Sequence, residues 1–416
     1  MVAPRTSDDW QTLGYEATQL FSPSAPVDES DLFAGRSTEL SRLTEVVLER
    51  GKHAVLYGER GVGKTSLARV FHLLFPAIIR KVLLVKEQVD PSDNFSTVWR
   101  KVFKDIELVF TDTTNETKRI TLSEIFNDDI TPDDVRRALE YSFNASDIPI
   151  IVIDEFDKAE DESVRTLTAN LLKHLSDYSV NVTVVIVGVA DDIGELITQH
   201  ESLARCIEQI PMPRMSNEEM REILTKRLPR LGMKIEPDAL WKVITLSRGL
   251  PAYVHLLGLY ATQDAIRNRR LTISEGNVDA AIRRALEKSQ ESIQREYAAA
   301  IHTNRTDTLF QEVLLACALA KTDDRGLFAP NAVVPTLTKI LDREVTIANF
   351  QNHLKKFISN ERERILIRRG KERAYKFRFR DPMMQPFVIM KGVENGLIEP
   401  KALDVLSSPA EPELPI

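Results

Sequence analysis

The chain has 416 residues, a formal net charge of −7 and two cysteines. This length is sufficient for two or three domains, each with its own hydrophobic core. Cys206 and Cys317 lie far apart in apolar stretches, which argues against a disulfide framework or a thiolate metal site and indicates a reducing compartment. The sequence has no signal-peptide pattern and no apolar run long enough to span a bilayer, so we expect a cytoplasmic protein without a membrane partner.

The first 30 residues are polar and contain three prolines, which predicts an N-terminal arm that lies on the surface or is partly disordered (residues 1–30). The composition changes at residues 31–36. Apolar residues with helical spacing follow at Leu40, Leu43 and Val46, and they predict an amphipathic helix.

The motif on which the function depends is G-x-x-x-x-G-K-T at residues 58–65, between an apolar run at 54–57 and a helical pattern of apolar residues. Its glycines permit positive φ angles and let successive backbone N–H groups point at an anion. Lys64 would contact the β- and γ-phosphates of ATP, and the Thr65 hydroxyl would bind Mg²⁺. The predicted nucleotide-binding residues of this loop are Gly58, Glu59, Arg60, Gly61, Val62, Gly63, Lys64, Thr65 and Ser66.

A second motif closes the continuous apolar run at residues 148–153 with acidic residues. Such a run is typical of a central strand in a parallel sheet, whose carboxyl end is the edge where ligands bind. In this Walker B motif, Asp154 would hold Mg²⁺, and Glu155 would orient and deprotonate the attacking water. Asp157 is either a helix cap or a supporting group of the site.

Further strand-like runs at residues 82–85, 182–187 and 207–211 are separated by helical patterns. They predict an α/β fold with a doubly wound parallel sheet, namely a P-loop NTPase core at residues 31–211. Within it, we expect residues 92–146 to form a polar, mostly helical insertion. Residues 212–300 follow with a helical pattern and predict an all-helical lid subdomain.

Three helical patterns and an alternating segment at residues 365–380 predict a C-terminal winged-helix domain at residues 301–392. In the alternating segment, Tyr375 and its apolar i+2 neighbours would face the core, while the cations between them face solvent. Residues 355–391 contain 12 Lys and Arg against 4 Asp and Glu, although the whole chain is acidic. Residues 393–416 are rich in proline and predict a disordered tail.

These motifs, in this order, resemble the branch of AAA+ ATPases that holds the origin-recognition and archaeal initiator proteins and the neighbouring STAND ATPases. The resemblance covers residues 31–390 and implies an ATPase that works as a homo-oligomer or with other subunits. Phe33, Gly35 and Arg36 are similar to the segment that binds the nucleotide base in AAA+ proteins.

The resemblance implies further roles outside the two motifs. Asp191 occupies the place of a residue that senses the γ-phosphate; because it is an acid, it would act on water or Mg²⁺. Arg205, with Arg214 as the alternative, would reach the ATP site of a neighbouring subunit. Pro251, in a Gly-x-Pro segment of the lid, would contact the nucleotide, and Arg248 is nearest to the position of a second sensor.

Two functions remain open at this point. In the first, ATP binding and hydrolysis control assembly and the binding of duplex DNA by the winged helix. In the second, the chain is a STAND-like signalling or defence ATPase whose winged helix contacts protein, including an acidic partner. The predicted DNA-binding residues are Lys355, Lys356, Arg368, Arg369, Lys371, Arg373, Lys376, Arg378 and Arg380.

Overall fold

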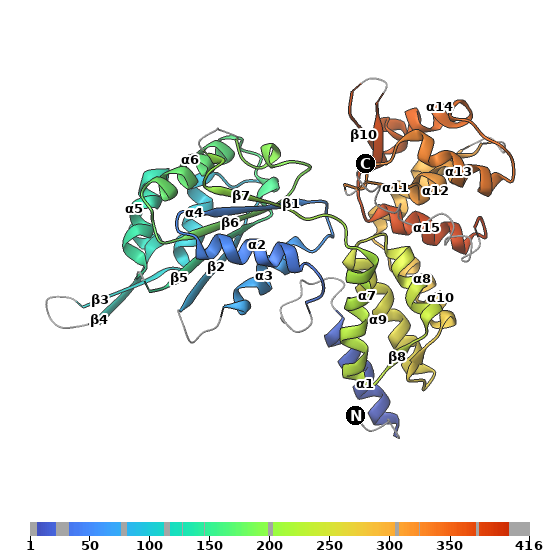
Figure 1. The fold of residues 1–416 in the computed structure, drawn as a ribbon, viewed down its shortest axis with the longest axis horizontal. Helices are drawn as coiled ribbons and strands as arrows, with labels where there is room; N and C mark the ends of the chain where they lie inside the picture. The colour runs from blue at the N-terminus through green and yellow to red at the C-terminus, as the bar shows by residue number, and fades with distance from the viewer. Residues whose placement is uncertain are drawn as a thin grey trace, which may run out of the picture. The chain divides into compact units, whose positions relative to one another are not determined.

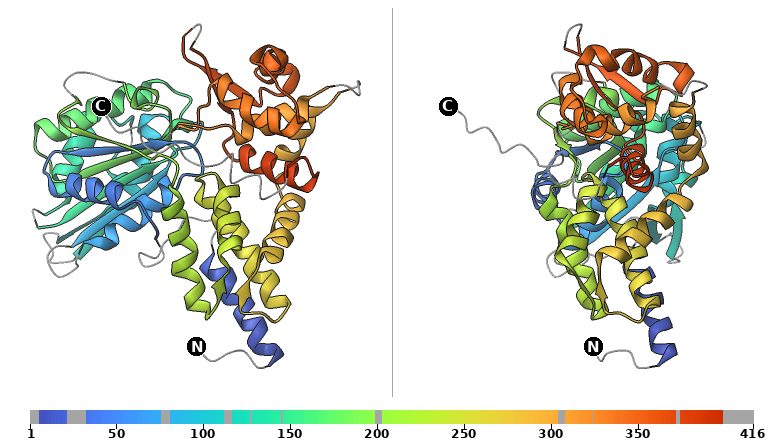
Figure 2. Two further views of the ribbon diagram at one scale, coloured as in Figure 1. Left: turned by 45° about the vertical axis from the view of Figure 1, so that its right-hand side comes forward. Right: turned by 90° about the vertical axis from the view of Figure 1, so that its right-hand side faces the viewer.

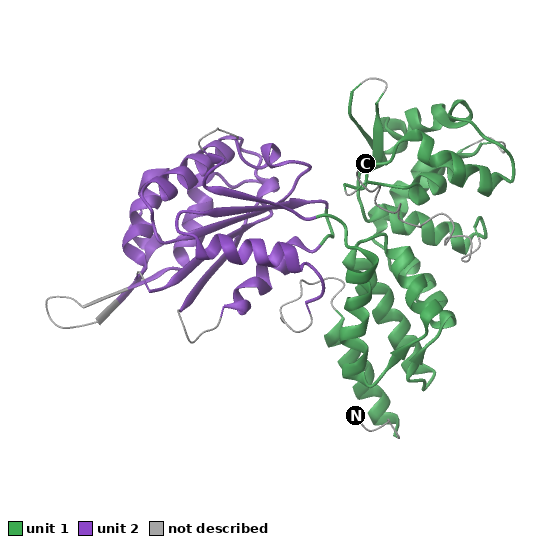
Figure 3. Cartoon of the chain, in the orientation of Figure 1, with its two compact units in different colours: residues 1–25, 60–62, 213–416 green, residues 26–59, 63–212 purple. Residues whose placement is uncertain are grey.

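The structure is a computed structural model of the 416-residue chain. The chain forms two compact units (Figure 3): unit 1 comprises residues 1–25, 60–62 and 213–416, and unit 2 comprises residues 26–59 and 63–212. In the part of the chain that the structure describes, no helix is long and apolar enough to cross a membrane. The described residues are 6–21, 33–75, 81–111, 117–126, 128–144, 146–198, 203–303, 308–323, 325–371 and 374–398.

Unit 2 is built on a parallel five-stranded sheet with the order β2–β5–β6–β1–β7 (Figure 1). Every residue of β5 is buried, as its continuous apolar run predicts for a strand covered on both faces. The predicted α/β fold with a parallel sheet is therefore confirmed. The strands are β1 (His53–Gly58), β2 (Val82–Gln88), β5 (Ile148–Asp154), β6 (Thr183–Val189) and β7 (Ile207–Pro211).

Helices cover both faces of this sheet (Figures 1 and 2). Three of them pack on the face that carries Ile151 and Ile153, where they enclose the main apolar core of the unit. These are α4 (Phe95–Lys104), α5 (Pro132–Ser142) and α6 (Ser163–Asp177). The other face is covered by α2 (Ser37–Leu48) and α3 (Lys64–Val70).

The insertion at residues 92–146 is less helical than its composition predicts. Between α4 and α5, β3 (Glu107–Thr111) and β4 (Thr117–Thr121) form an antiparallel pair in which Leu108 lies opposite Ile120. The segment is rich in threonine and other β-branched residues, which favour an extended backbone. The expectation of a mostly helical insertion was wrong at this hairpin.

The N-terminal segment is also different from the expected polar arm. Residues Ser7–Leu20 form α1, which begins with a capping box between Thr6 and Asp9 and packs against α9 (Pro251–Arg267). Phe21 follows the helix and lies over Gly258, where an added Cβ would come within 2.8 Å of its ring. The absence of a side chain at residue 258 therefore creates the space that the aromatic ring fills.

The segment predicted as an all-helical lid contains one short parallel strand pair, β8 (Lys234–Ile235) with β9 (Thr272–Ile273). The buried Lys242 ties two of its helices together through ion pairs with Glu275 and Asp279, at 2.8 and 2.7 Å. The remaining elements are helical, as predicted. They are α7 (Asn217–Arg227), α8 (Pro237–Ser247), α10 (Glu275–Glu287) and α11 (Glu291–Ile301).

The C-terminal part, which also belongs to unit 1, contains three helices followed by an antiparallel hairpin. Phe328 adds a bridge to Phe377 of the hairpin. Residues 399–416 of the predicted tail lie outside the described residues, whereas Ile398 is buried. The elements are α12 (Phe310–Leu319), α13 (Pro330–Leu341), α14 (Ile347–Phe357), β10 (Leu366–Arg369), β11 (Lys376–Phe379) and α15 (Met384–Glu394).

Among the described residues, His53 of unit 2 and His255 of unit 1 are buried and have a lowered pKa. In unit 2, Nδ1 of His53 accepts a hydrogen bond from the Val184 N–H at 3.1 Å, and burial lowers the pKa of His53 from 6.5 to about 4. In unit 1, burial and then the charge of Arg227 lower the pKa of His255 to about 3. Both imidazoles are therefore neutral in the folded protein at neutral pH.

Mild acid should destabilise both units. The unfolded chain takes up a proton at each histidine near pH 6.5, whereas the folded chain does not, so each lowered pKa reduces the free energy of unfolding by about 1.4 kcal/mol per pH unit below that point. Urea unfolding at about pH 7 and about pH 5.5 measures this loss. His255→Phe keeps a ring against Phe21 and should lose less stability between these pH values than the wild type. An equal loss in both proteins would contradict the prediction for His255.

Candidate nucleotide-binding site

The predicted phosphate loop connects β1 to α3 and depends on glycine at three positions. Gly58, Gly61 and Gly63 have φ angles of 154°, 86° and 97°, which residues with a side chain rarely adopt. At Gly58, an added Cβ would lie 2.4 Å from the carbonyl oxygen of Met212, the residue that follows β7. The loop can therefore approach the neighbouring backbone only because this position has no side chain.

Lys64 is buried at the start of α3, and its ammonium group is held by the loop itself. Nζ donates to the carbonyl oxygens of Gly58 at 3.0 Å and Glu59 at 2.8 Å. Of the other predicted loop residues, Arg60 is exposed and Val62 is buried, while Ser66 is half-buried on the first turn of α3. A cation held by neutral carbonyl groups beside a turn of backbone N–H groups suits a polyphosphate ligand.

Thr65 and Asp154 bring the two sequence motifs together, because both line one pocket. The carboxylate of Asp154 accepts a hydrogen bond from the Glu155 N–H at 2.8 Å. Burial raises the pKa of Asp154, while the nearby Thr65 hydroxyl, this hydrogen bond and the charge of Lys64 oppose the rise. A hydroxyl and a carboxylate side by side are the oxygen donors that Mg²⁺ prefers, so the pair fits this metal.

Mg²⁺ commonly takes only one or two protein ligands and completes its shell with water and phosphate oxygens. In the described part of the chain, no group of three or more His, Cys, Asp and Glu side chains could hold a metal ion. The Thr65–Asp154 pair is thus compatible with a metal that arrives with the nucleotide.

Glu155 directly follows β5 and has a left-handed backbone, with φ 55°. This conformation is costly for a residue with a side chain and is commonly found at functional sites. Its Oε2 atom lies 2.6 Å from Nζ of Lys158, three residues later. Asp157 accepts a hydrogen bond from the Val189 N–H at 2.7 Å, so it fixes the end of β6 rather than capping a helix.

Asp191 lies two residues after β6, at the same sheet edge as Asp154, because both follow the carboxyl ends of neighbouring parallel strands. Its N–H donates to Oε2 of Glu195 at 3.0 Å, and its side chain is half-buried. The structure therefore places Asp191 on the expected edge of the sheet.

The predicted base-binding segment immediately precedes α2, and Arg36 caps its first turn. Phe33 is buried, Gly35 has a φ of 65°, and Arg36 is buried with a φ of 61°. The guanidinium of Arg36 donates to Oε1 of Glu39 at 3.1 Å, in the first turn of the helix. Arg36 thus supports this turn of the backbone through its pairing with Glu39.

Arg205 lies at the opposite edge of the sheet from the phosphate loop. It precedes β7, whose first residue pairs with the first residue of β1, whereas the loop follows the last residue of β1. Its guanidinium forms an ion pair with Asp177 at the end of α6. The structure therefore does not bring Arg205 to the ATP site of its own chain.

The remaining predicted residues of the nucleotide site belong to unit 1. Arg214 donates to the side chain of Gln385 at 2.6 Å, and Arg248 donates to the carbonyl oxygen of Ala320 at 3.1 Å. Burial, and then the charge of Arg214, lower the pKa of Arg248 to about 10. Both arginines thus join segments of unit 1 to one another. Pro251 is the first residue of α9 and is buried.

The predicted DNA-binding residues gather on α14 and the β10–β11 hairpin. Lys355 and Lys356 are exposed at the end of α14, and Arg378 is half-buried. Four of the cations contact side chains of the same unit. Lys376 pairs with Asp323 and Arg380 with Glu296, while Arg368 stacks on the ring of Tyr375 and Lys356 lies over the ring of Phe310. The further members Arg369 and Lys371 are exposed, whereas Arg373 lies outside the described residues.

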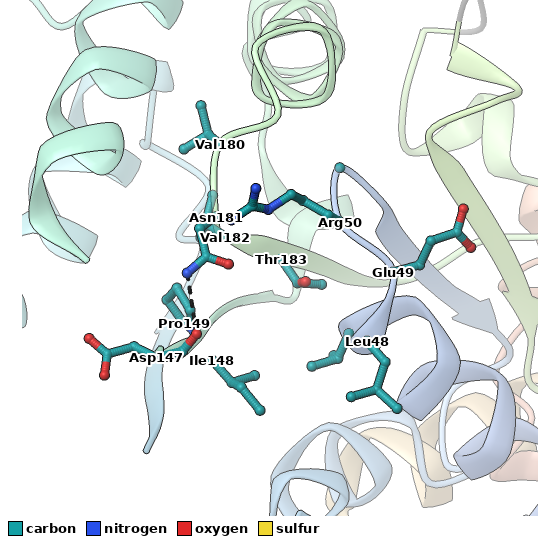
Figure 4. Close-up of a pocket in the computed structure, with 12 residues that line it drawn as sticks. Leu48, Glu49, Arg50, Asp147, Ile148, Pro149, Val180, Asn181, Val182 and Thr183 are labelled. Atoms are coloured by element: carbon teal, nitrogen blue, oxygen red, sulfur yellow. Dashed lines mark hydrogen bonds between the residues drawn. The ribbon is translucent and has the colours of Figure 1, made fainter. Parts of the chain in front are cut away.

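Unit 2 has pockets at both edges of its sheet. One, of about 430 Å³, adjoins Thr65 and Asp154. Another, of about 180 Å³, is formed at the opposite edge by residues 47–51, 147–149 and 180–183 and contains none of the predicted site residues (Figure 4). The larger pocket extends the candidate site beyond the two motifs.

Sequence reasoning missed three cations at this site. Lys158 could have been found from its position three residues after Glu155, because both lie in one helical turn. Arg69 and Lys86 line the larger pocket from α3 and β2, and only the pairing of the strands shows that they meet there.

Residues 22–343, more than half of the chain, match the family described as Novel STAND NTPase 1 (nSTAND1). The chain belongs to this family. The nSTAND1 chain is therefore a P-loop NTPase, and its resemblance to AAA+ P-loop ATPases is confirmed at that level. No curated protein matches the sequence.

Solved structures similar to this nSTAND1 chain include the Walker-type ATPase PABY2304 of Pyrococcus abyssi. It has 16% sequence identity and a TM-score of 0.50, with 88% of this chain and 98% of the other covered. The ORC1 protein of Aeropyrum pernix, solved with DNA, has 14% identity and a TM-score of 0.48, with 91% and 96% covered. The RuvB motor of Thermotoga maritima has 14% identity and a TM-score of 0.43, with 84% and 94% covered. At such identities the likeness shows the fold alone.

Lys64→Ala should abolish measurable ATP binding, because it removes the ammonium group at the centre of the phosphate loop. Calorimetric titration of ATP with Mg²⁺ into the variant measures this. Lys52→Ala is the matched control, since Lys52 contacts Glu49 at the other end of β1 and should keep wild-type affinity. Micromolar ATP binding by the Lys64 variant would show that the loop does not bind the phosphates in this way.

Proposed function

We propose that the chain binds ATP with Mg²⁺ in unit 2 and hydrolyses it as a regulated switch. The observation that supports this most is that Thr65 and Asp154 line one pocket, beside the buried ammonium of Lys64. This arrangement combines a phosphate-binding loop with a pair of Mg²⁺ ligands. Bound Mg²⁺ would neutralise the charge that develops on the phosphate oxygens.

Glu155 is the proposed general base. It would accept a proton from the attacking water as the water oxygen bonds to the γ-phosphorus and the bond to the bridging oxygen of ADP breaks. Lys158 pairs with this carboxylate, so the ion pair must loosen before Glu155 can hold the water. Because 46% of the Lys158 side chain and 40% of the Glu155 side chain are exposed, this pair is weak enough to open.

Glu155→Gln should keep ATP bound and slow its hydrolysis by about 10²-fold or more, the usual effect of losing a general base. The amide keeps the shape of the side chain but cannot take the proton. Single-turnover hydrolysis, with ATP affinity measured on the same preparation, tests this. Lys158→Gln is the matched variant and should hydrolyse at least as fast as the wild type, because it frees the base. Wild-type turnover by the Glu155 variant would remove this residue from the mechanism.

We propose that the site is completed by a second copy or another subunit. Arg205 lies on the surface, at the edge of the sheet opposite the phosphate loop. This location suits action on a neighbouring molecule and not on its own chain. The ion pair with Asp177 would have to open for this contact.

For the C-terminal part of unit 1, we propose a winged helix that binds duplex DNA. α14 would be the helix that enters the major groove. It contains no acidic residue, and its exposed side chains include Asn349, Gln351, Asn352, Lys355 and Lys356. Amides can recognise base edges, and lysines can contact phosphates, so this helix has the composition of a DNA-reading surface.

A second candidate partner is an acidic protein. The ion pairs of Lys376 with Asp323 and of Arg380 with Glu296 show that cations of the hairpin can pair with protein carboxylates. Ile347, 39% exposed at the start of α14, adds an apolar contact that a protein could cover. In this alternative, the nucleotide state would control protein assembly.

Replacing Lys355, Lys356 and Lys371 with alanine should weaken DNA binding and leave ATP hydrolysis unchanged. The slope of log K against log salt is negative, and each lost phosphate contact makes it less steep by about 0.9, so three lost contacts flatten it by about 2.7. DNA titrations at several salt concentrations measure the slope. Lys52, Lys81 and Lys104 of unit 2, replaced together, provide a control with the same change in charge. An unchanged slope, or no binding by the wild type at low salt, would favour the protein partner.

A further inference from the structure

The larger pocket of unit 2 is lined by Thr65 and Asp154, the residues proposed to hold Mg²⁺, and otherwise by residues outside the phosphate loop. It has a volume of about 430 Å³. Its walls come from α3, the end of β2 and β5, with Lys101 added from α4. Most of the residues that line the pocket are polar or charged, unlike those of an apolar core cavity. It therefore has the character of a binding site for a small polar ligand.

Two cations that line the pocket, Arg69 and Lys86, come from α3 and from the sheet. Arg69 is four residues after Thr65, so it lies on the same face of α3, about 6 Å further along the helix axis. On the sheet, Lys86 lies opposite Val152, two residues before Asp154 and on the same face of the strands. The pocket thus leads from the proposed Mg²⁺ ligands to Arg69 and Lys86.

The three cations that line this pocket are matched in number by Glu87, Asp90 and Asp154, but they are not all in ion pairs. Lys101 is held by Asp90 and Asp93 at 2.7 and 2.6 Å. By contrast, Nζ of Lys86 donates to the carbonyl oxygen of Arg69 at 3.4 Å. Across the described ranges of the chain, no ion pair joins either Arg69 or Lys86 to a carboxylate. Burial, and then the charge of Arg69, lower the pKa of Lys86, as expected for two like charges held close together.

We propose that this pocket binds the inorganic phosphate released from ATP. Two neighbouring cations suit an oxyanion, because arginine and lysine provide several charged N–H donors. The volume is ample for a hydrated phosphate, since one water molecule in the liquid takes about 30 Å³. The inference rests on the proposed ATP hydrolysis. It adds that phosphate leaves the catalytic position along α3, toward Arg69, and is held there before its release.

The first test is direct binding of inorganic phosphate to the full chain saturated with ADP and Mg²⁺, measured by calorimetry. The double variant Arg69→Gln, Lys86→Gln should bind phosphate at least tenfold more weakly than the wild type. Arg50→Gln, which removes a cation from the pocket at the opposite edge (Figure 4), is the matched control and should bind as the wild type does. Equal phosphate affinity in all three proteins would overturn the proposal.

The second test identifies the source of the phosphate. In a single turnover, a fluorescent phosphate sensor follows phosphate release while quenched samples follow ADP formation. The double variant should shorten the delay between the two signals. An unchanged delay, together with weaker phosphate binding, would overturn the assignment to the product phosphate and leave a site for a free oxyanion.

The two proposals can fail separately. A chain that neither binds nor hydrolyses ATP but binds phosphate through Arg69 and Lys86 would overturn the ATPase mechanism and keep the anion site. A chain that hydrolyses ATP with phosphate affinity unaffected by the double variant would do the reverse. Thermal unfolding of each variant shows whether the exposed substitutions leave the fold intact.

Discussion

The meeting of Thr65 and Asp154 in one pocket is the feature on which the candidate site depends. The two residues belong to motifs about 90 residues apart in the sequence, and they meet because β1, β6 and β5 are neighbouring parallel strands whose carboxyl ends share one edge. Burying the Asp154 carboxylate raises its pKa, and the Thr65 hydroxyl and the Lys64 charge oppose this effect. The arrangement therefore keeps a carboxylate in a partly dry site where a cation would stabilise it further.

The sequence predicted those parts of the fold whose causes are local. The apolar run at residues 148–153 and the glycines of the phosphate loop report burial and backbone conformation directly, so the strands and the loop were found. The helix α1 was missed because its stability comes from a distant partner, α9. Phe21, for example, is buried only because Gly258 leaves room for it more than 200 residues later.

The contacts of the arginine side chains were also not predictable from the sequence. A sequence position before or after a strand does not reveal what a long cationic side chain contacts. Arg248 donates to the carbonyl oxygen of Ala320, and Arg205 pairs with Asp177, so both have partners within the chain that sequence spacing could not indicate. Lys86 was overlooked for a related reason: its significance appears only when β2 lies beside β5 and Arg69 lies opposite.

The proximity of Arg69 and Lys86 has a thermodynamic consequence. Two cations held close together destabilise the folded chain by their repulsion, and an anion between them removes that penalty. Phosphate binding should therefore be linked to the stability of α3 and the β2 edge, the elements that also carry Thr65 and border Asp154. A pocket of this kind would make the structure around the Mg²⁺ ligands firmer while phosphate is present and looser once it leaves. Such a difference is what a nucleotide-controlled switch needs.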